Sequence, residues 1–178
     1  MNKSDYKLID SRELQGNVFE LIGDKWMLVT AANQSGKFNT MTASWGGMGI
    51  MWGKPYANCV VRPVRYTYEF MEEVNYFTLS FFSEKYRDAL NLLGTKSGRD
   101  GDKVKESGLT EFDIFELKNI SSARIISYKQ ADIILVCKKI YYQDIDPANF
   151  IDKDLDRNYP NKDYHRMYFG EIIRIQVQ

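Results

Sequence analysis

The side chains best suited to binding a small ligand occur in one short segment, Asn39-Thr-Met-Thr-Ala-Ser-Trp45. Its alternation is typical of a strand, which places Thr40, Thr42 and Ser44 on one face and Met41 and Trp45 on the other. A glycine-rich stretch, 46–49, follows and would let a flat ligand approach the backbone. The pattern favours a planar ligand that needs short hydrogen-bond donors and acceptors.

Basic residues gather in two further segments that would suit an anion. The first, 62–67, ends at Thr67, where a helix is expected to begin and backbone N–H groups favour negative charge. The second, 96–103, combines flexible glycines with Lys96, Ser97, Arg99 and Lys103. Together with Arg65, these side chains would hold a phosphate dianion by charge-assisted hydrogen bonds.

The same cations have a second interpretation. Glu69, Asp100 and Asp102 lie close in the sequence, and surface ion pairs with them would use the basic side chains without any ligand. Short basic motifs also occur by chance. Spacing alone leaves the phosphate site and the solvated ion pairs equally acceptable.

Composition and motif spacing exclude several other classes of protein. The 178 residues carry 24 basic and 24 acidic side chains, which argues against a whole-surface grip on nucleic acid or on an anionic membrane. Neither Gly-Lys pair has the spacing of a phosphate-binding loop, and the glycines at 46–49 lack the dinucleotide fingerprint. One histidine and two distant cysteines predict no metal site, and the acidic run near Asp152 is interpreted as a solvated loop. Cys59 and Cys137 are expected to be buried, reduced thiols.

Hydrophobic patterning supplies the elements that must position these residues. Strands are expected at 26–32, 39–45, 56–61, 76–82, 112–115, 123–127, 132–142 and 167–177. Helices are expected from Thr67 and from Ser83, each as an N-cap, with a helical turn after the 96–107 loop. Short strands with two inserted helices predict a mainly β, barrel-like α+β fold.

The chain is expected to form one domain over 1–178, with an N-terminal arm at 1–16 and an acidic excursion at 143–165. The sequence shows neither a signal-peptide pattern nor an apolar stretch long enough to cross a membrane, so a cytoplasmic location is expected.

Five motifs in order resemble those of the flavin reductase-like family: NTMTASWGGMGIMWGKP, VVRPVRYTYEFMEE, FTLSFF, GTKSGRDGDK and DYHRMYFGEI. The resemblance runs from about Asn17 to about Ile175. It implies an FMN-binding split β-barrel, usually a homodimer, with one FMN per subunit. The implied FMN-binding residues are Asn39, Thr40, Met41, Thr42, Ser44, Trp45, Arg65, Thr67, Ser97, Arg99 and Lys103.

His165, the chain's one histidine, stands beside the last of these motifs. A lone histidine is more often structural than catalytic, but this position predicts that it faces the flavin or the reductant. Hydride transfer from nicotinamide to flavin N5 requires no protein proton, so His165 would orient the donor or protonate reduced flavin.

The resemblance implies an NAD(P)H-dependent flavin reductase. The principal alternative is a flavoredoxin-like electron carrier that holds FMN and is reduced by a protein partner. A third possibility is a flavin-binding or flavin-storage module without turnover. No dinucleotide fingerprint is present, so NADH and NADPH are not distinguished.

Overall fold

The computed structural model describes residues 6–114, 117 and 124–178. Its strands are β1 (Lys7–Ile9), β2 (Met27–Ala32), β3 (Phe38–Ala43), β4 (Gly46–Met51), β5 (Lys54–Val61), β6 (Tyr76–Phe81), β7 (Glu111–Asp113), β8 (Ile126–Tyr128), β9 (Ile133–Asp144) and β10 (Arg166–Val177). Its α-helices are α1 (Tyr66–Glu73), α2 (Arg87–Thr95) and α3 (Lys103–Ser107). The expectation of a mainly β chain with inserted helices is confirmed.

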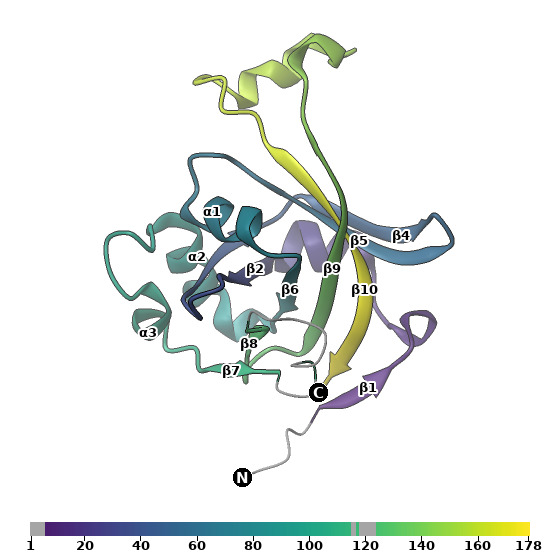
Figure 1. Cartoon of the computed structure of the whole chain (residues 1–178), viewed down its shortest axis with the longest axis vertical. Helices are drawn as coiled ribbons and strands as arrows, with labels where there is room; N and C mark the ends of the chain where they lie inside the picture. Colours follow the sequence, from purple (N-terminus) through teal and green to yellow (C-terminus); the bar gives the residue numbers. More distant parts are fainter. Residues whose placement is uncertain (1–5, 115–116, 118–123) are drawn as a thin grey trace.

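One antiparallel sheet forms the body of the molecule, in the order β3-β2-β6-β9-β10-β5-β4. The long strands β9 and β10 run through its middle, and α1, α2 and α3 lie on one side of them (Figure 1). The expected N-terminal arm contributes β1, which pairs with β10 through Lys7↔Val177 and Ile9↔Ile175. Strands β7 and β8 form a separate small ribbon.

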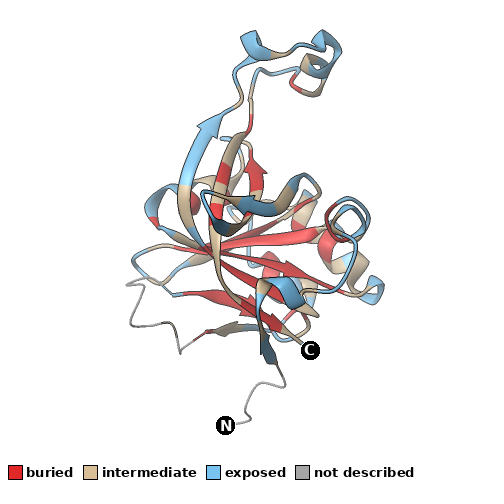
Figure 2. Ribbon diagram, turned by 90° about the vertical axis from the view of Figure 1, so that its right-hand side faces the viewer, coloured by how far each residue is buried: buried red, intermediate tan, exposed pale blue. Residues whose placement is uncertain are grey.

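The apolar run at 27–32 is buried along its whole length because both faces of β2 are covered. Val29 joins a core cluster that includes Phe77 and Leu135 inside the curved sheet. Leu28, on the other face, belongs to a second cluster with Leu93 of α2. The buried strands converge in the centre of the molecule (Figure 2).

The glycine-rich stretch 46–49 forms strand β4, which the sequence pattern did not predict. Gly46 pairs with Cys59 of β5, and a Cβ at Gly46 would lie 2.2 Å from the backbone oxygen of Asn58. Gly46 is therefore required by close strand pairing. The expectation that this stretch lets a flat ligand approach the backbone stays a prediction.

The excursion at 143–165 projects beyond the sheet, as the top of Figure 1 shows. It contains two short 3-10 helices, Pro147–Asn149 and Lys153–Asn158. Ile151 at its far end is 97% exposed. At its base, Arg62 forms an ion pair of 3.0 Å with Asp163 and so ties the excursion to the end of β5.

Cys59 and Cys137 are both free and buried, as expected. Burial raises the pKa of the Cys59 thiol to about 12, so it is not a reactive thiolate. Among the described residues, no helix has the length and hydrophobicity needed to span a membrane.

Candidate ligand-binding site

Three segments that the sequence analysis singled out meet at the start of β3. The side-chain nitrogen of Asn39 donates a hydrogen bond of 2.8 Å to the Thr67 hydroxyl, and both residues are buried. Gly98 lies against the same amide, where an added Cβ would fall 2.1 Å from Asn39 Oδ1. Asn39, α1 and the 96–103 loop thus form one contiguous structure.

Thr67 does not cap α1 as the sequence predicted. The N-cap position is taken by Arg65, which makes no side-chain capping bond, and Thr67 lies inside the first turn. Its hydroxyl accepts the bond from Asn39, a partner in a distant strand, in place of the local backbone N–H.

A pocket of about 440 Å³ opens beside this junction, within the size range of small-molecule sites. Its lining consists of Gly36, Lys37, Phe38, Asn39, Tyr66, Gly98, Gly101, Asp102, Lys103, Val104 and Arg124. Sequence reasoning missed Lys37, Tyr66 and Arg124. Lys37 donates a 2.8 Å hydrogen bond to the Tyr66 hydroxyl, and only the fold brings these two residues together.

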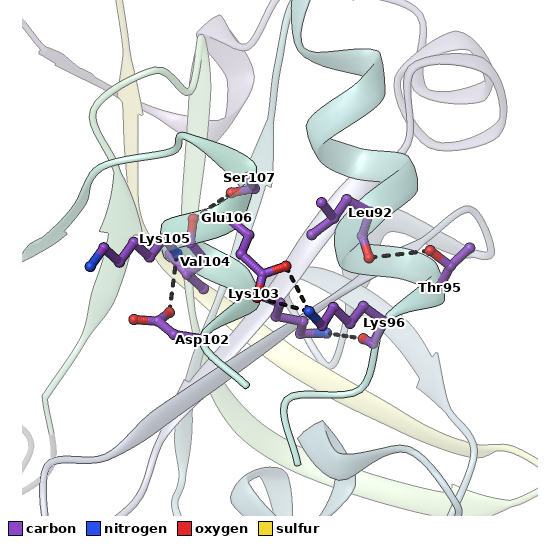
Figure 3. Close-up of polar contacts among 9 residues, drawn as sticks. All are labelled: Leu92, Thr95, Lys96, Asp102, Lys103, Val104, Lys105, Glu106 and Ser107. Carbon is purple, nitrogen blue, oxygen red and sulfur yellow. Dashed lines mark hydrogen bonds and ion pairs between the residues drawn. The ribbon is translucent and has the colours of Figure 1, made fainter. Parts of the chain in front are cut away.

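Lys103 contributes a buried ammonium group to this pocket. Its Nζ donates to the backbone oxygen of Leu93 at 2.9 Å and to that of Lys96 at 3.0 Å, at the carboxyl end of α2. Figure 3 shows the bond to Lys96. Burial, followed by the charge of Arg65, lowers the pKa of Lys103 to about 8. The neighbouring Lys96 is neutralised by Glu106.

Arg65 binds the same helix end, donating a 2.5 Å hydrogen bond to the Gly94 oxygen. Burial and then the charge of Arg62 lower the pKa of the guanidinium. Arg65 and Lys103 donate to backbone carbonyl oxygens, and within the described part of the chain neither forms an ion pair with a carboxylate. An anion placed here would relieve their mutual repulsion.

Arg99 is exposed and forms a surface ion pair, the second interpretation of the basic residues given above. Its guanidinium pairs with Glu69 and stands over the Tyr66 ring, 4.6 Å from the centroid. Ser97 Oγ accepts a 3.2 Å hydrogen bond from the Arg99 backbone N–H. The roles of Ser97 and Arg99 in binding a phosphate therefore stay predictions.

The polar face expected along β3 is occupied by internal contacts. Thr40 is buried against Thr30, with 2.9 Å between the hydroxyl oxygens, and Met41 lies in the sheet core. Thr42 donates a 2.5 Å bond to Leu90 of α2. Within the described sheet, β3 is an edge strand whose hydrogen-bonded neighbour is β2. Its outer backbone groups are better placed to meet a ligand than these three side chains.

A second cluster lies just past the other end of β3. Ser44 is half-buried, and Trp45 is 46% exposed with its ring centroid 5.2 Å from that of His165. His165 Nδ1 is 2.9 Å from the hydroxyl of Tyr159, which comes from the excursion. Sequence reasoning did not single out Tyr159 as a partner of His165.

Burial and the charge of Arg62 lower the pKa of His165 to about 4, against an opposing effect of Asp163. The imidazole is therefore neutral near pH 7. Of the two roles expected for His165, this favours orienting the donor by hydrogen bonding over protonating reduced flavin.

The two clusters lie at opposite ends of a six-residue strand, which spans roughly 20 Å at about 3.3 Å per residue. One end offers the cations Arg65 and Lys103, and the other offers an exposed indole beside a neutral imidazole. The arrangement suits an elongated ligand with an anionic end and a flat end. In the described part of the chain, no group of three His, Cys, Asp or Glu side chains is placed to hold a metal ion.

Comparison with known families gives one match over most of the chain. A family model described as flavin reductase like domain matches residues 20–141. No curated protein matches the sequence.

Solved structures share the fold at low sequence identity. An FMN-binding domain of a flavin reductases-like enzyme from Shewanella baltica has a TM-score of 0.67 at 16% identity, covering 99% of this chain and 79% of that one. Flavoredoxin from Desulfovibrio vulgaris gives 0.64 at 22%, covering 100% and 77%. Nitrilotriacetate monooxygenase component B from Bacillus cereus gives 0.65 at 16%, covering 95% and 80%. Likeness at these identities establishes the fold.

Proposed function

The chain belongs to the flavin reductase-like family and has its split β-barrel fold, and from this premise we propose that it is an NAD(P)H-dependent, FMN-binding flavin reductase. The observation that carries the proposal is the presence of two clusters at opposite ends of β3. At one end, Asn39, Thr67 and Gly98 lie beside the cations Arg65 and Lys103. Past the other end, Trp45 lies beside His165.

The residues present fit the phosphate end of FMN. Gly98 leaves a backbone cradle next to Asn39. Lys103 supplies a buried and Arg65 a half-buried positive charge, neither with a carboxylate partner among the residues that the structure describes. Lys37 and the hydroxyl of Tyr66 add donors at the mouth of the same pocket. Charge-assisted hydrogen bonds from such groups are the strongest polar contacts available to a phosphate.

The residues past the other end of β3 fit the flat ring. Trp45 presents an exposed aromatic surface, and Ser44 and the outer edge of β3 supply hydrogen-bonding groups. Bound FMN would supply the N5 position that accepts hydride from a nicotinamide. The protein's contribution is to align the two rings, with neutral His165 as an orienting hydrogen-bond partner.

A different class of function uses the same site. A flavoredoxin-like electron carrier would hold FMN and receive electrons from a redox protein, and the likeness to flavoredoxin favours it as the second candidate. A flavin-storage module would bind FMN without turnover.

Absorption spectroscopy of the purified protein, with anaerobic addition of NADH and then NADPH, separates these functions. We expect a yellow protein that one nucleotide bleaches, which also identifies the donor. A yellow protein that neither nucleotide bleaches favours the electron carrier, which a reduced ferredoxin-type partner would then reduce. A protein that cannot be loaded with FMN contradicts the cofactor assignment.

We also propose that the chain forms a homodimer. The excursion supports this because Ile151 and Leu155 expose apolar surface well away from the sheet, at 97% and 45%. Aromatic surface is also exposed by Trp52, in the turn between β4 and β5, and by Tyr141 and Tyr142 of β9. Aromatic residues are enriched at protein interfaces.

A further inference from the structure

The excursion places one buried tyrosine directly on His165. Tyr159 Oη lies 2.9 Å from His165 Nδ1, and the two residues are 3% and 8% exposed. Their rings meet edge to face, with centroids 5.4 Å apart and planes at 79°. In this geometry the phenol hydroxyl contacts Nδ1, and the opposite edge of the imidazole, which carries Nε2, is left for another partner.

Tyr159 is itself held firmly. Arg62 stands over its ring, 5.2 Å from the centroid. The same guanidinium donates to both Asp163 carboxylate oxygens at 3.0 Å and to the Asn158 backbone oxygen at 2.8 Å. Arg62 therefore fixes the excursion on both sides of Tyr159, before and after it in sequence.

Further aromatic contacts support the ring from within the excursion. Tyr164 lies 4.8 Å from Tyr159 between centroids, and Phe150 stacks on it at 6.1 Å with planes 20° apart. The position of the phenol is thus set by packing and by the Arg62 anchor. A group held in this way can orient a neighbour without loss of side-chain freedom on ligand binding.

The direction of the hydrogen bond follows from the protonation states. The low pKa of His165 keeps one proton on the imidazole at neutral pH, and burial raises the pKa of Tyr159, so the phenol keeps its proton. Among the described residues, the hydrogen-bond partner of the Tyr159 hydroxyl is His165 Nδ1. A phenol is also the stronger acid of the two, so it donates and Nδ1 accepts.

We propose that Tyr159 is a positioning residue that donates to His165 Nδ1 and so holds the imidazole as the Nε2–H tautomer, ready to donate to an acceptor atom of the ligand beside Trp45. The use made of this donor rests on the proposed function. The tautomer itself does not, and it can be measured without flavin. The charged groups acting on the imidazole are Arg62 from the end of β5 and Asp163 from the excursion.

Nitrogen-15 NMR tests the tautomer directly, because the chain has one histidine and the imidazole signals need no assignment. In the full-length protein we expect a protonated Nε2 and an unprotonated Nδ1 through the neutral range. Tyr159→Phe should give mixed tautomers and a higher pKa for His165, since the neutral ring loses its donor. A wild-type Nδ1–H tautomer, or unchanged signals in Tyr159→Phe, would overturn the proposal.

Tyr164→Phe is the matched control, because it removes a hydroxyl from the same excursion that bonds Asp156 at 2.7 Å. We expect its histidine signals to match wild type. In FMN-loaded protein, Tyr159→Phe should slow the anaerobic reduction of FMN by the nucleotide by about three- to tenfold, at unchanged FMN affinity. Tyr164→Phe should leave this rate unchanged. Equal reduction rates in both variants would contradict the positioning role. Failure of the wild-type protein to bind FMN or to be reduced would instead contradict the proposed function, and the NMR result would stand.

Discussion

The carboxamide of Asn39 and the hydroxyl of Thr67, 28 positions apart, are joined by a buried 2.8 Å hydrogen bond. This bond fixes the start of β3 against the first turn of α1. Gly98 packs on the same carboxamide so closely that no side chain would fit there. This contact positions the loop that carries Ser97 and Arg99. The geometry of the proposed phosphate site depends on these two contacts.

Gly98→Ala should weaken FMN binding by at least about tenfold, because its Cβ would fall 2.1 Å from Asn39 Oδ1 and must displace the loop or the amide. Gly23→Ala is the control, since nothing lies within 4 Å of its Cβ position. Flavin fluorescence quenching measures both affinities. Equal affinity in the two variants would show that the 98 loop lies outside the flavin site.

Lys103→Met should lower FMN affinity by about tenfold to a hundredfold through loss of a charge-assisted contact. Lys105→Met, an exposed lysine on the same helix, should bind as wild type. Calorimetry gives the affinities, and thermal melting separates lost binding from lost stability, because Lys103 also binds the end of α2. Unchanged affinity in well-folded Lys103→Met would remove this residue from the site.

The affinity for FMN should fall as the pH rises through about 8. The free protein then loses the Lys103 proton that a bound phosphate would retain, so binding just above pH 8 takes up a proton. Below about pH 6 the phosphate itself becomes a monoanion, which also weakens binding. Titration calorimetry in buffers of different ionisation enthalpy measures the proton uptake, which Lys103→Met should abolish.

Arg99→Ala should weaken FMN binding by about tenfold to a hundredfold if Arg99 turns from Glu69 to the phosphate. Glu69→Gln should then act in the opposite direction, tightening binding by about two- to fivefold because an exposed ion pair costs little to break. Arg99→Ala with wild-type affinity would assign Arg99 to a solvated surface ion pair, the alternative that the sequence left open.

His165→Ala should leave FMN bound and slow its reduction by the nucleotide. Because the pKa of His165 is about 4, the imidazole stays neutral from pH 5.5 upward, and the wild-type reduction rate should show no step near pH 6.5. Stopped-flow absorbance across this pH range measures the rate. A step near pH 6.5 that disappears in His165→Ala would restore the role of proton donor.

Ile151→Glu should shift the protein toward the monomer if the excursion packs on a second copy, since it places a charge on a residue that is 97% exposed in one chain. Leu8→Glu, which alters an exposed aliphatic residue on β1, is the control. Light scattering after size exclusion gives the mass. A wild-type monomer, or a dimer unaffected by Ile151→Glu, contradicts this role of the excursion.

Most strands and helices could be predicted from the residue pattern alone, because these patterns depend on neighbours a few residues apart. The apolar run of β2 and the alternation along β10 both predicted strands correctly. Even in β10, the alternation of side chains between the two faces is interrupted within the strand. A register shift between Ile172 and Arg174 places Ile172 with Val177 in one cluster and Ile173 in the other, although strict strand alternation would put Ile173 and Val177 on the same face.

The pattern could not predict which of the chemically suitable residues come together or how their polar groups are used, because both depend on how the chain packs. Thr67 bonds Asn39 instead of capping its own helix, Thr40 turns inward, and burial lowers the pKa values of Lys103 and His165. Each outcome depends on partners far away in the chain. Local residue types fix what a side chain can do, and packing fixes its partner, its exposure to water and therefore its charge.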